Sequence, residues 1–241
     1  MTGPSDDATG PDPDGAFADA TRVRDAGDGR FDAEIAEGWD IVGNTNGGYL
    51  LSIAGRAMAA AADRPDPVSV TAHYLAPGRP GPAAVQTSVV RSGRRFATVR
   101  AGLSSGDRDL LAVLGTFGDL SVDGGAPDLH IDGGPPDLPP PEQCAPIVPA
   151  APFPPPFMGH VELRMHPDDA DFLEGRRSGT PRMRGWFRLP DREPVDTITL
   201  LTAVDAFPPT IFNADLPVGW TPTLELTAHV RARPAPGWLA C

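Results

Sequence analysis

The sequence predicts an α+β protein built from two copies of one unit, in which a buried helix is followed by antiparallel strands. The first observation behind this prediction is the segment 44–62, whose only charged residue is Arg56. A helix that is apolar nearly all round must be buried. The second observation is a series of segments over 68–117 that alternate apolar and polar residues, as half-buried strands do. The third is the tripeptide Thr-Ala-His, which occurs at 71–73 and again at 227–229 and follows a predicted helix both times.

Four segments are predicted along the 241-residue chain. Residues 1–16 are acidic and rich in glycine and proline, so we expect a disordered tail. Residues 17–120 form the first copy and residues 157–241 the second. The stretch 121–156 between them contains 12 of the 30 prolines, which predicts an extended linker.

The first copy is expected to begin with a strand at 31–42 that leads into the buried helix. Asn44 and Asn46 are both good N-caps for this helix. Gly47 and Gly48 allow a backbone or a ligand to approach the free N–H groups of the first turn. Such a helix N-terminus can polarise a carbonyl oxygen. The alternative is an ordinary core helix preceded by a glycine turn.

Four strands are predicted after this helix, at 68–74, 84–91, 96–103 and 110–117, with turns at Ser92-Gly93 and Ser105-Gly106. The first of them alternates cleanly. The residues expected to point inward are Val68, Val70, Ala72 and Tyr74.

The second copy is expected to repeat this order in a shorter form. Strands are predicted at 158–165, 182–189 and 223–234, and a helix at 196–207. Only 12 residues follow His229, whereas the first copy continues for 45 residues after His73. The second copy is therefore expected to lack two or three strands. Either it is truncated, or it completes its sheet with a strand from another chain, which would make the protein a homo-oligomer.

The composition excludes several classes of function. All 20 basic residues are arginines and the net charge is −12. Lysine nucleophiles and P-loop lysines are therefore excluded, and neither nucleic acid nor an anionic membrane is expected as a partner. The two cysteines and five histidines lack metal-ligand spacing, so we predict no metal and no cofactor. Because no secretory leader and no apolar run of roughly 18 residues are present, we expect a cytoplasmic protein that does not insert into membranes.

Five motifs in order resemble those of a known family. They are Asn-Gly-Gly-Tyr-Leu at 46–50, His-Tyr-Leu-Ala-Pro-Gly at 73–78, the arginine-rich hairpin at 90–100, Ala-Val-Asp-Ala-Phe-Pro-Pro at 203–209 and Thr-Leu-Glu-Leu-Thr-Ala-His at 223–229. Together they resemble the double-hotdog acyl-CoA thioesterases of the thioesterase II or TesB-like type. The resemblance runs from about Phe17 to the last residue and leaves out most of the proline-rich stretch.

This resemblance implies a fold and an activity. The fold is a double hotdog, in which each of two tandem repeats wraps a curved antiparallel sheet round a long helix, here with the second repeat incomplete at its C-terminus. The activity is hydrolysis of acyl-CoA to a free fatty acid and coenzyme A. In the family, an Asp on the second helix, a Ser or Thr at the start of the following strand and a Gln near the C-terminus hold the attacking water. Asp205 matches the first and Thr223 the second, while the Gln position falls in the part that the second copy lacks.

The site residues also have simpler interpretations. From the pattern alone, Asp205 could be a solvated acid and Thr223 an ordinary strand threonine. Ala76 stands where many members of the family carry Arg, which removes one expected phosphate contact. With the third catalytic group lost, the chain would be a catalytically impaired protein that binds acyl-CoA or acyl chains.

Substrate-binding residues are predicted in two places. The start of the first helix is expected to face the thioester, through Asn46, Gly47, Gly48 and Tyr49. The arginine-rich hairpin is expected to hold the phosphates of coenzyme A, through Arg91, Arg94 and Arg95. A solvated hairpin with no ligand is the alternative for these arginines.

Overall fold

The computed structural model describes residues 15–120, 134–217 and 219–241. The predicted disordered tail, up to residue 14, and residues 121–133 of the predicted linker lie outside the described residues. The N-terminal part contains the helices α1 (Ala16–Ala20) and α2 (Gly47–Ala62) and the strands β1 (Val23–Gly27), β2 (Arg30–Ile35), β3 (Asp40–Ile41), β4 (Asn44–Thr45), β5 (Asp66–Tyr74), β6 (Gly81–Ser92), β7 (Ala97–Ser105) and β8 (Arg108–Gly118). The C-terminal part contains the helix α3 (Thr199–Ala203) and the strands β9 (Ala145–Ile147), β10 (Glu162–Met165), β11 (Gly185–Arg188), β12 (Glu225–His229) and β13 (Leu239–Ala240). Short 3₁₀ helices join these elements at Pro141–Gln143, Pro156–Gly159, Pro167–Asp169, Asp171–Glu174, Pro190–Arg192 and Thr210–Asn213.

Helix α2 is buried, as its composition predicts. Asn46 is its N-cap and accepts a hydrogen bond from the Tyr49 N–H at 2.8 Å. Asn44, the other predicted N-cap, belongs instead to the short strand β4 that precedes the helix. The helix ends at Asp63, which adopts the left-handed conformation with φ 51°. Most of its side chains are inaccessible to solvent, including Leu51, Ile53 and Met58.

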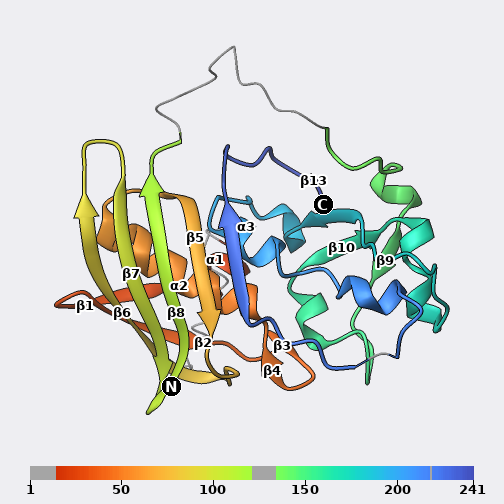
Figure 1. Cartoon of the computed structure of the whole chain (residues 1–241), viewed down its shortest axis with the longest axis horizontal. Helices are drawn as coiled ribbons and strands as arrows, with labels where there is room; N and C mark the ends of the chain where they lie inside the picture. The colour runs from red at the N-terminus through yellow and green to blue at the C-terminus, as the bar shows by residue number, and fades with distance from the viewer. Residues whose placement is uncertain (1–14, 121–133, 218) are drawn as a thin grey trace, which may run out of the picture.

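Seven strands form one antiparallel sheet in the order β1-β2-β6-β7-β8-β5-β12. Figure 1 shows α2 lying behind this sheet. The sheet side chains buried against it are those that alternate along each strand, such as Val85, Val99, Leu103 and Val113. The predicted strands at 84–91, 96–103 and 110–117 are confirmed as β6, β7 and β8; β6 and β8 extend beyond the prediction at both ends, and β7 is shifted toward the C-terminus. The predicted strand 31–42 is wrong beyond Ile35, because the chain leaves the strand conformation at Gly38, where φ is 82°, and only Asp40–Ile41 is extended again, as β3.

The two Thr-Ala-His segments pair with each other at the end of this sheet. Strand β12 runs antiparallel to β5 with Thr71 opposite Thr227, and their hydroxyl oxygens are 2.9 Å apart. Val70 lies opposite Ala228, and Ala72 lies opposite Leu226. The pairing is therefore unchanged when the two segments are exchanged, which is the geometry of a local twofold axis between the threonines.

The C-terminal part is less regular than its pattern predicts. Its second sheet has the order β13-β11-β10-β9. The strand predicted at 158–165 forms only over Glu162–Met165, because the prolines before it favour the 3₁₀ turn Pro156–Gly159. The strand predicted at 182–189 is limited to β11 and the one at 223–234 to β12. The helix predicted at 196–207 is a single turn at Thr199–Ala203, and Pro208 and Pro209 follow it closely.

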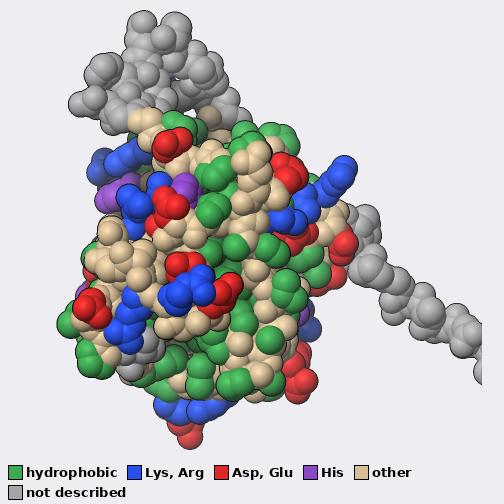
Figure 2. Space-filling model, turned by 90° about the vertical axis from the view of Figure 1, so that its right-hand side faces the viewer, with side chains coloured by type: hydrophobic (Ala, Val, Ile, Leu, Met, Phe, Trp, Pro, Cys, Tyr) green, Lys and Arg blue, Asp and Glu red, His purple; other side chains and the backbone are tan. Residues whose placement is uncertain are grey.

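The core is continuous between the two parts. The Trp39 ring is stacked between Tyr49 and His160, with ring centroids 4.3 and 4.5 Å away. Helix α2 contacts α3 through the Ser52 hydroxyl, which lies 2.8 Å from the Thr202 hydroxyl. Figure 2 shows hydrophobic, acidic and basic side chains interspersed on the face of the C-terminal part, without an extended patch of one charge on that face. No helix in the described ranges is long and apolar enough to span a membrane.

Candidate active site

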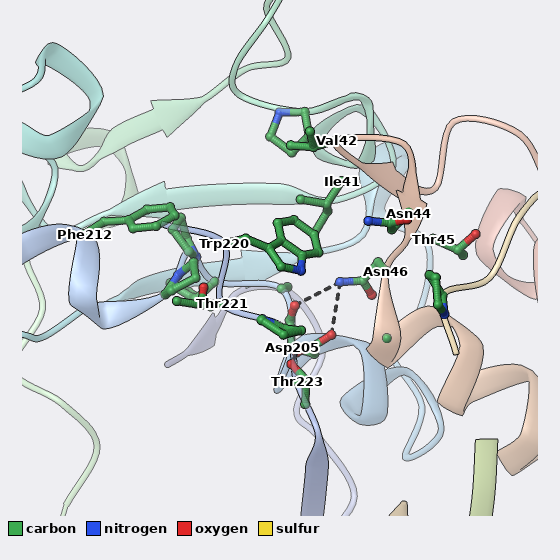
Figure 3. Close-up of a pocket in the computed structure, with 18 of the residues that line it drawn as sticks. Ile41, Val42, Asn44, Thr45, Asn46, Asp205, Phe212, Trp220, Thr221 and Thr223 are labelled. Atoms are coloured by element: carbon green, nitrogen blue, oxygen red, sulfur yellow. Dashed lines mark hydrogen bonds between the residues drawn. The ribbon is translucent and has the colours of Figure 1, made fainter. Parts of the chain in front are cut away.

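A cavity of about 750 Å³ opens at the N-terminal end of α2, between the two parts of the chain. Its apolar wall includes Ile41, Leu75, Phe153, Phe172, Phe212 and Trp220. Its polar wall includes Thr45, Asn46, Tyr74, Asp205 and Thr223. Figure 3 shows Asp205, Asn46 and Thr223 converging at one side of this cavity, with Trp220 across from them. Such an apolar cavity with a few convergent polar groups is typical of a site for a small organic ligand.

The Asp205 carboxylate is held by donors from three residues, two at the start of α2 and one just before β12. The Gly48 N–H at the start of α2 donates to Oδ2 at 2.9 Å, and the Asn46 amide donates to the same oxygen at 3.2 Å. The Thr223 hydroxyl donates to Oδ1 at 3.2 Å. The Asn46 amide also lies 3.0 Å from the Asp205 backbone carbonyl, and Figure 3 shows both Asn46 contacts. The carboxylate is thereby fixed in one orientation at the cavity wall.

Glycines at the start of α2 make this approach possible. A Cβ at Gly48 would lie 2.7 Å from the Leu201 carbonyl oxygen and 2.9 Å from the Asp205 Cβ. A Cβ at Gly47 would lie 2.7 Å from Tyr74 Cε1 and 3.0 Å from Asp205 Oδ2. Both distances at Gly48 are shorter than real Cβ contacts allow, so only glycine lets α2 approach α3 this closely. The prediction that the glycines allow a close backbone approach is confirmed, and the backbone is that of α3.

Burial controls the electrostatics of the site. It raises the pKa of Asp205 above the ordinary value of 3.8, and hydrogen bonds from Gly48, Thr223, Gly47 and Asn46 oppose this rise in part. A raised pKa makes the carboxylate a stronger base than a free aspartate. Burial, together with the nearby Asp205 charge, also raises the pKa of Tyr74, so its hydroxyl keeps its proton.

Tyr49 does not reach the cavity. Its side chain is fully buried, and its hydroxyl donates to the Ala20 carbonyl at 2.8 Å and accepts from the Ala36 N–H at 3.0 Å. Burial raises its pKa to about 12. It is therefore a core residue that ties α2 to the N-terminal segment.

The three hairpin arginines also lie away from the cavity. Arg91, Arg94 and Arg95 are exposed on the β6–β7 hairpin. The Arg94 carbonyl accepts a hydrogen bond at 3.4 Å from Arg64, which follows the C-terminal end of α2. The cavity is at the other end of the same helix, about 24 Å away at 1.5 Å per residue. The hairpin therefore belongs to the opposite end of the molecule from Asp205.

Other residues of the cavity were not predicted from the sequence. Arg176 and Arg177 line it in a segment that showed no periodic pattern, and so do Phe212 and Trp220. Tyr74 was predicted to point inward, and in the structure it is one of the residues that line the cavity. Among the residues that the structure describes, no group of His, Cys, Asp and Glu side chains is arranged to hold a metal ion.

Comparison with known families gives this geometry a context. A model of the acyl-CoA thioesterase N-terminal domain matches residues 35–118, and a model of the acyl-CoA thioesterase C-terminal domain matches residues 141–241. The chain belongs to the acyl-CoA thioesterase family. The chain is also 31% identical over 232 residues to an uncharacterized protein of Mycobacterium tuberculosis, an alignment that covers 87% of this chain and 78% of that protein.

Solved structures place the chain among hotdog folds. It is similar to a candidate thioesterase II from Thermobifida fusca, with a TM-score of 0.83 and 32% identity over 96% of this chain and 86% of that one. It also resembles a hotdog-fold protein of unknown function from Alicyclobacillus acidocaldarius, with a TM-score of 0.75 and 22% identity over 90% and 79% of the two chains. The second likeness shows the fold alone. The α+β hotdog prediction is confirmed at this level.

Proposed function

We propose that this member of the acyl-CoA thioesterase family hydrolyses acyl-CoA, with Asp205 as the general base. The attacking water sits beside the Asp205 carboxylate and the Thr223 hydroxyl, and it loses a proton to Asp205 as its oxygen bonds to the thioester carbonyl carbon. The tetrahedral intermediate then breaks its C–S bond, and the departing sulfur takes the proton from Asp205. The products are a free carboxylic acid and coenzyme A, and the carboxylate is regenerated.

The observation that carries this proposal is the buried, multiply bonded carboxylate at the cavity wall. A carboxylate on a solvated helix face would not be held by three donors that come from 46, 48 and 223. Burial also raises the pKa of Asp205, which is the direction that improves a general base. The site therefore resembles a reaction centre more than a surface ion site.

The cavity suggests how the substrate lies. Its apolar and aromatic wall suits an acyl chain. Arg177, which lines the cavity, contacts Asp215 at 3.8 Å, and the Asp215 side chain is 96% exposed. Such a weak pair can be exchanged for a phosphate of coenzyme A. We therefore assign the phosphate contact to Arg177 in preference to the distant hairpin arginines.

We also infer that residues 17–120 and 157–241 are two hotdog repeats. The twofold pairing of β5 with β12 supports this inference, because equivalent strands of two copies are expected to meet at their symmetry axis. The short α3 and the separate four-stranded sheet support a second repeat that is less complete than the first.

The test is release of free thiol from acyl-CoAs of increasing chain length. Asp205→Asn keeps every hydrogen bond at the site, because its oxygen can accept from Gly48 and its amide can donate to Thr223. We expect it to lower kcat by about 10²- to 10⁴-fold through loss of the base alone. Asp63→Asn is the matched control, since this fully exposed residue at the far end of α2 has a side chain 102% accessible. Equal rates for wild type and Asp205→Asn would dismiss the general base, and binding without release would identify the impaired binding protein instead.

A further inference from the structure

Three phenylalanines form an aromatic cluster in the wall of the cavity. The Phe212 ring contacts the rings of Phe153 and Phe172, with centroids 6.5 and 6.2 Å away, and all three side chains line the cavity. The ring planes are inclined by 76° and 44°, so neither pair is a parallel stack. Phe153 is 39% exposed and the other two rings are partly exposed. The cluster therefore keeps ring surface that a planar ligand can cover.

Two arginines belong to the same end of the cavity. Arg176 and Arg177 line it just after the 3₁₀ helix that carries Phe172. Arg177 contacts Asp215, which lies just beyond the 3₁₀ helix of Phe212, at 3.8 Å. Among the described residues that line the cavity, the only other charged one is the proposed base. The positive charge of the cavity wall is therefore confined to the end with the aromatic cluster.

The opposite end of the cavity is uncharged and more deeply buried. Figure 3 shows Asp205 between Phe212 on one side and Thr45 on the other. At the Thr45 end, a Cβ at Gly78 would lie 2.9 Å from Leu50 Cδ1 and 3.2 Å from Thr45 Cβ, so these three residues pack together. Leu50 is only 2% exposed. A buried and uncharged end of this kind suits an alkyl group.

A thioester bound at Asp205 extends in two directions. The acyl group leaves one side of the carbonyl carbon, and the sulfur with its pantetheine arm leaves the other. A guanidinium group binds a phosphate well, whereas it is costly to desolvate beside an alkyl chain. The charged nucleotide of coenzyme A also favours the end that is open to water. Charge and exposure therefore assign coenzyme A to the aromatic end and the acyl group to the Thr45 end.

We propose that the cluster of Phe153, Phe172 and Phe212 is the subsite for the adenine of coenzyme A. The inference rests on the proposed function, which gives Arg177 a phosphate contact. Adenine stacks on the ring surface of the cluster, which is a general way for proteins to hold a nucleobase. Arg176 stays paired with the carboxylates of its own segment. Because adenine lies far from the reacting bond, the cluster contributes binding equally to substrate and transition state.

The test compares two unreactive ligands, an alkyl thioether of coenzyme A and the same thioether of pantetheine, which lacks the nucleotide. Phe212→Leu removes the ring and keeps an apolar side chain. We expect it to weaken binding of the coenzyme A thioether by about 3- to 10-fold and to leave binding of the pantetheine thioether unchanged. With acyl-CoA as substrate, KM should rise by a similar factor while kcat stays within about twofold. Equal weakening of both thioethers would mean that the ring contacts another part of the ligand, and the adenine assignment would be wrong.

Phe96→Leu is the matched control. Phe96 is 46% exposed and lies in the arginine-rich β6–β7 hairpin, where the sequence suggested the phosphate site. This variant should bind both thioethers as wild type does. Weaker binding of the coenzyme A thioether by Phe96→Leu would place the nucleotide at the hairpin and overturn the proposal. If Phe212→Leu melts well below wild type, Phe172→Leu repeats the comparison with a second ring of the cluster.

The outcome can be separated from that of the proposed function. Thiol release tests hydrolysis, and the thioethers test the subsite without any reaction. If wild type releases thiol but binds the two thioethers equally, the hydrolase proposal stands and the subsite is refuted. If wild type releases no thiol but prefers the coenzyme A thioether, and Phe212→Leu reduces that preference, the subsite stands and the hydrolase proposal fails. If wild type neither releases thiol nor binds either thioether, both proposals fail.

Discussion

Replacing Gly48 with alanine tests the close contact between α2 and α3. The added Cβ would lie 2.7 Å from the Leu201 carbonyl oxygen, 2.9 Å from Thr202 Cα and 2.9 Å from Asp205 Cβ. None of these atoms is the flexible end of a side chain, so the helices must separate. Such overpacking costs about 1–3 kcal/mol. The better helix propensity of alanine offsets at most about 1 kcal/mol of this. We therefore expect a net loss of about 1–2 kcal/mol.

The same shift should reduce activity, because the Gly48 N–H positions the Asp205 carboxylate. A displacement approaching 1 Å at a reacting group costs up to about 100-fold in rate, so we expect thiol release to slow by about 10- to 100-fold. A thermal melt should show a decrease of about 2–8 °C, at 2–4 °C per kcal/mol for a chain of this size.

Gly55→Ala is the control in the same helix. Its Cβ would meet the ends of the Leu201 and Ile198 side chains, at 2.9 and 3.3 Å, and these can rotate away. This variant should therefore melt within about 2 °C of wild type and keep its rate. If Gly48→Ala melted at or above the wild-type temperature with full activity, the reasoning from the α2–α3 contact would be refuted.

Three further outcomes are expected. Burial raises the pKa of Asp205, so the free energy of unfolding of wild type should fall relative to that of Asp205→Asn as pH rises from about 3.8 through the folded pKa. Urea unfolding of both proteins at pH 3 and pH 7 measures this difference in free energy, and an equal difference at the two pH values would contradict the expectation. Burial lowers the pKa of His160, so stability present above pH 6.5 should be lost as pH falls through the folded pKa, and His160→Phe should melt with less pH dependence. Asp169 is 1% exposed and paired with an arginine, so Asp169→Asn should cost about 3 kcal/mol in chemical unfolding; if it cost no more than the same change at the exposed Asp171, the buried pair would not matter.

The regular elements could be predicted from the sequence because they depend on short-range patterns. Helix α2 carries apolar residues at every turn, and buried and more exposed side chains alternate along β7 and most of β8, so only one face of each strand can be the buried one. Helix α3 was predicted too long because the helical spacing of Ile198, Leu201, Thr202 and Asp205 extends past its end. In the structure the chain instead turns after Ala203, which brings Asp205 back toward α2.

The candidate site was only partly accessible to sequence reasoning. Asp205 and Thr223 were placed by resemblance, and the structure brings them together at 3.2 Å. Tyr49 was assigned by its position in a motif. It follows Gly48 by one residue in α2, and its side chain therefore points into the core, where the Trp39 ring stacks on it. The arginine-rich hairpin was misplaced because a local motif does not show which end of α2 it will meet. These are long-range relations that periodicity does not encode.

The pairing of β12 with β5 has a consequence for synthesis in the cell. The two strands are about 150 positions apart in the sequence. At 5–20 residues per second, the ribosome needs roughly 8–30 s between them. During this interval the outer edge of β5 is an open row of backbone donors and acceptors, able to pair with a neighbouring nascent chain. Crowded polysomes should therefore make this protein depend on chaperones that cover such an edge until Thr227 arrives opposite Thr71.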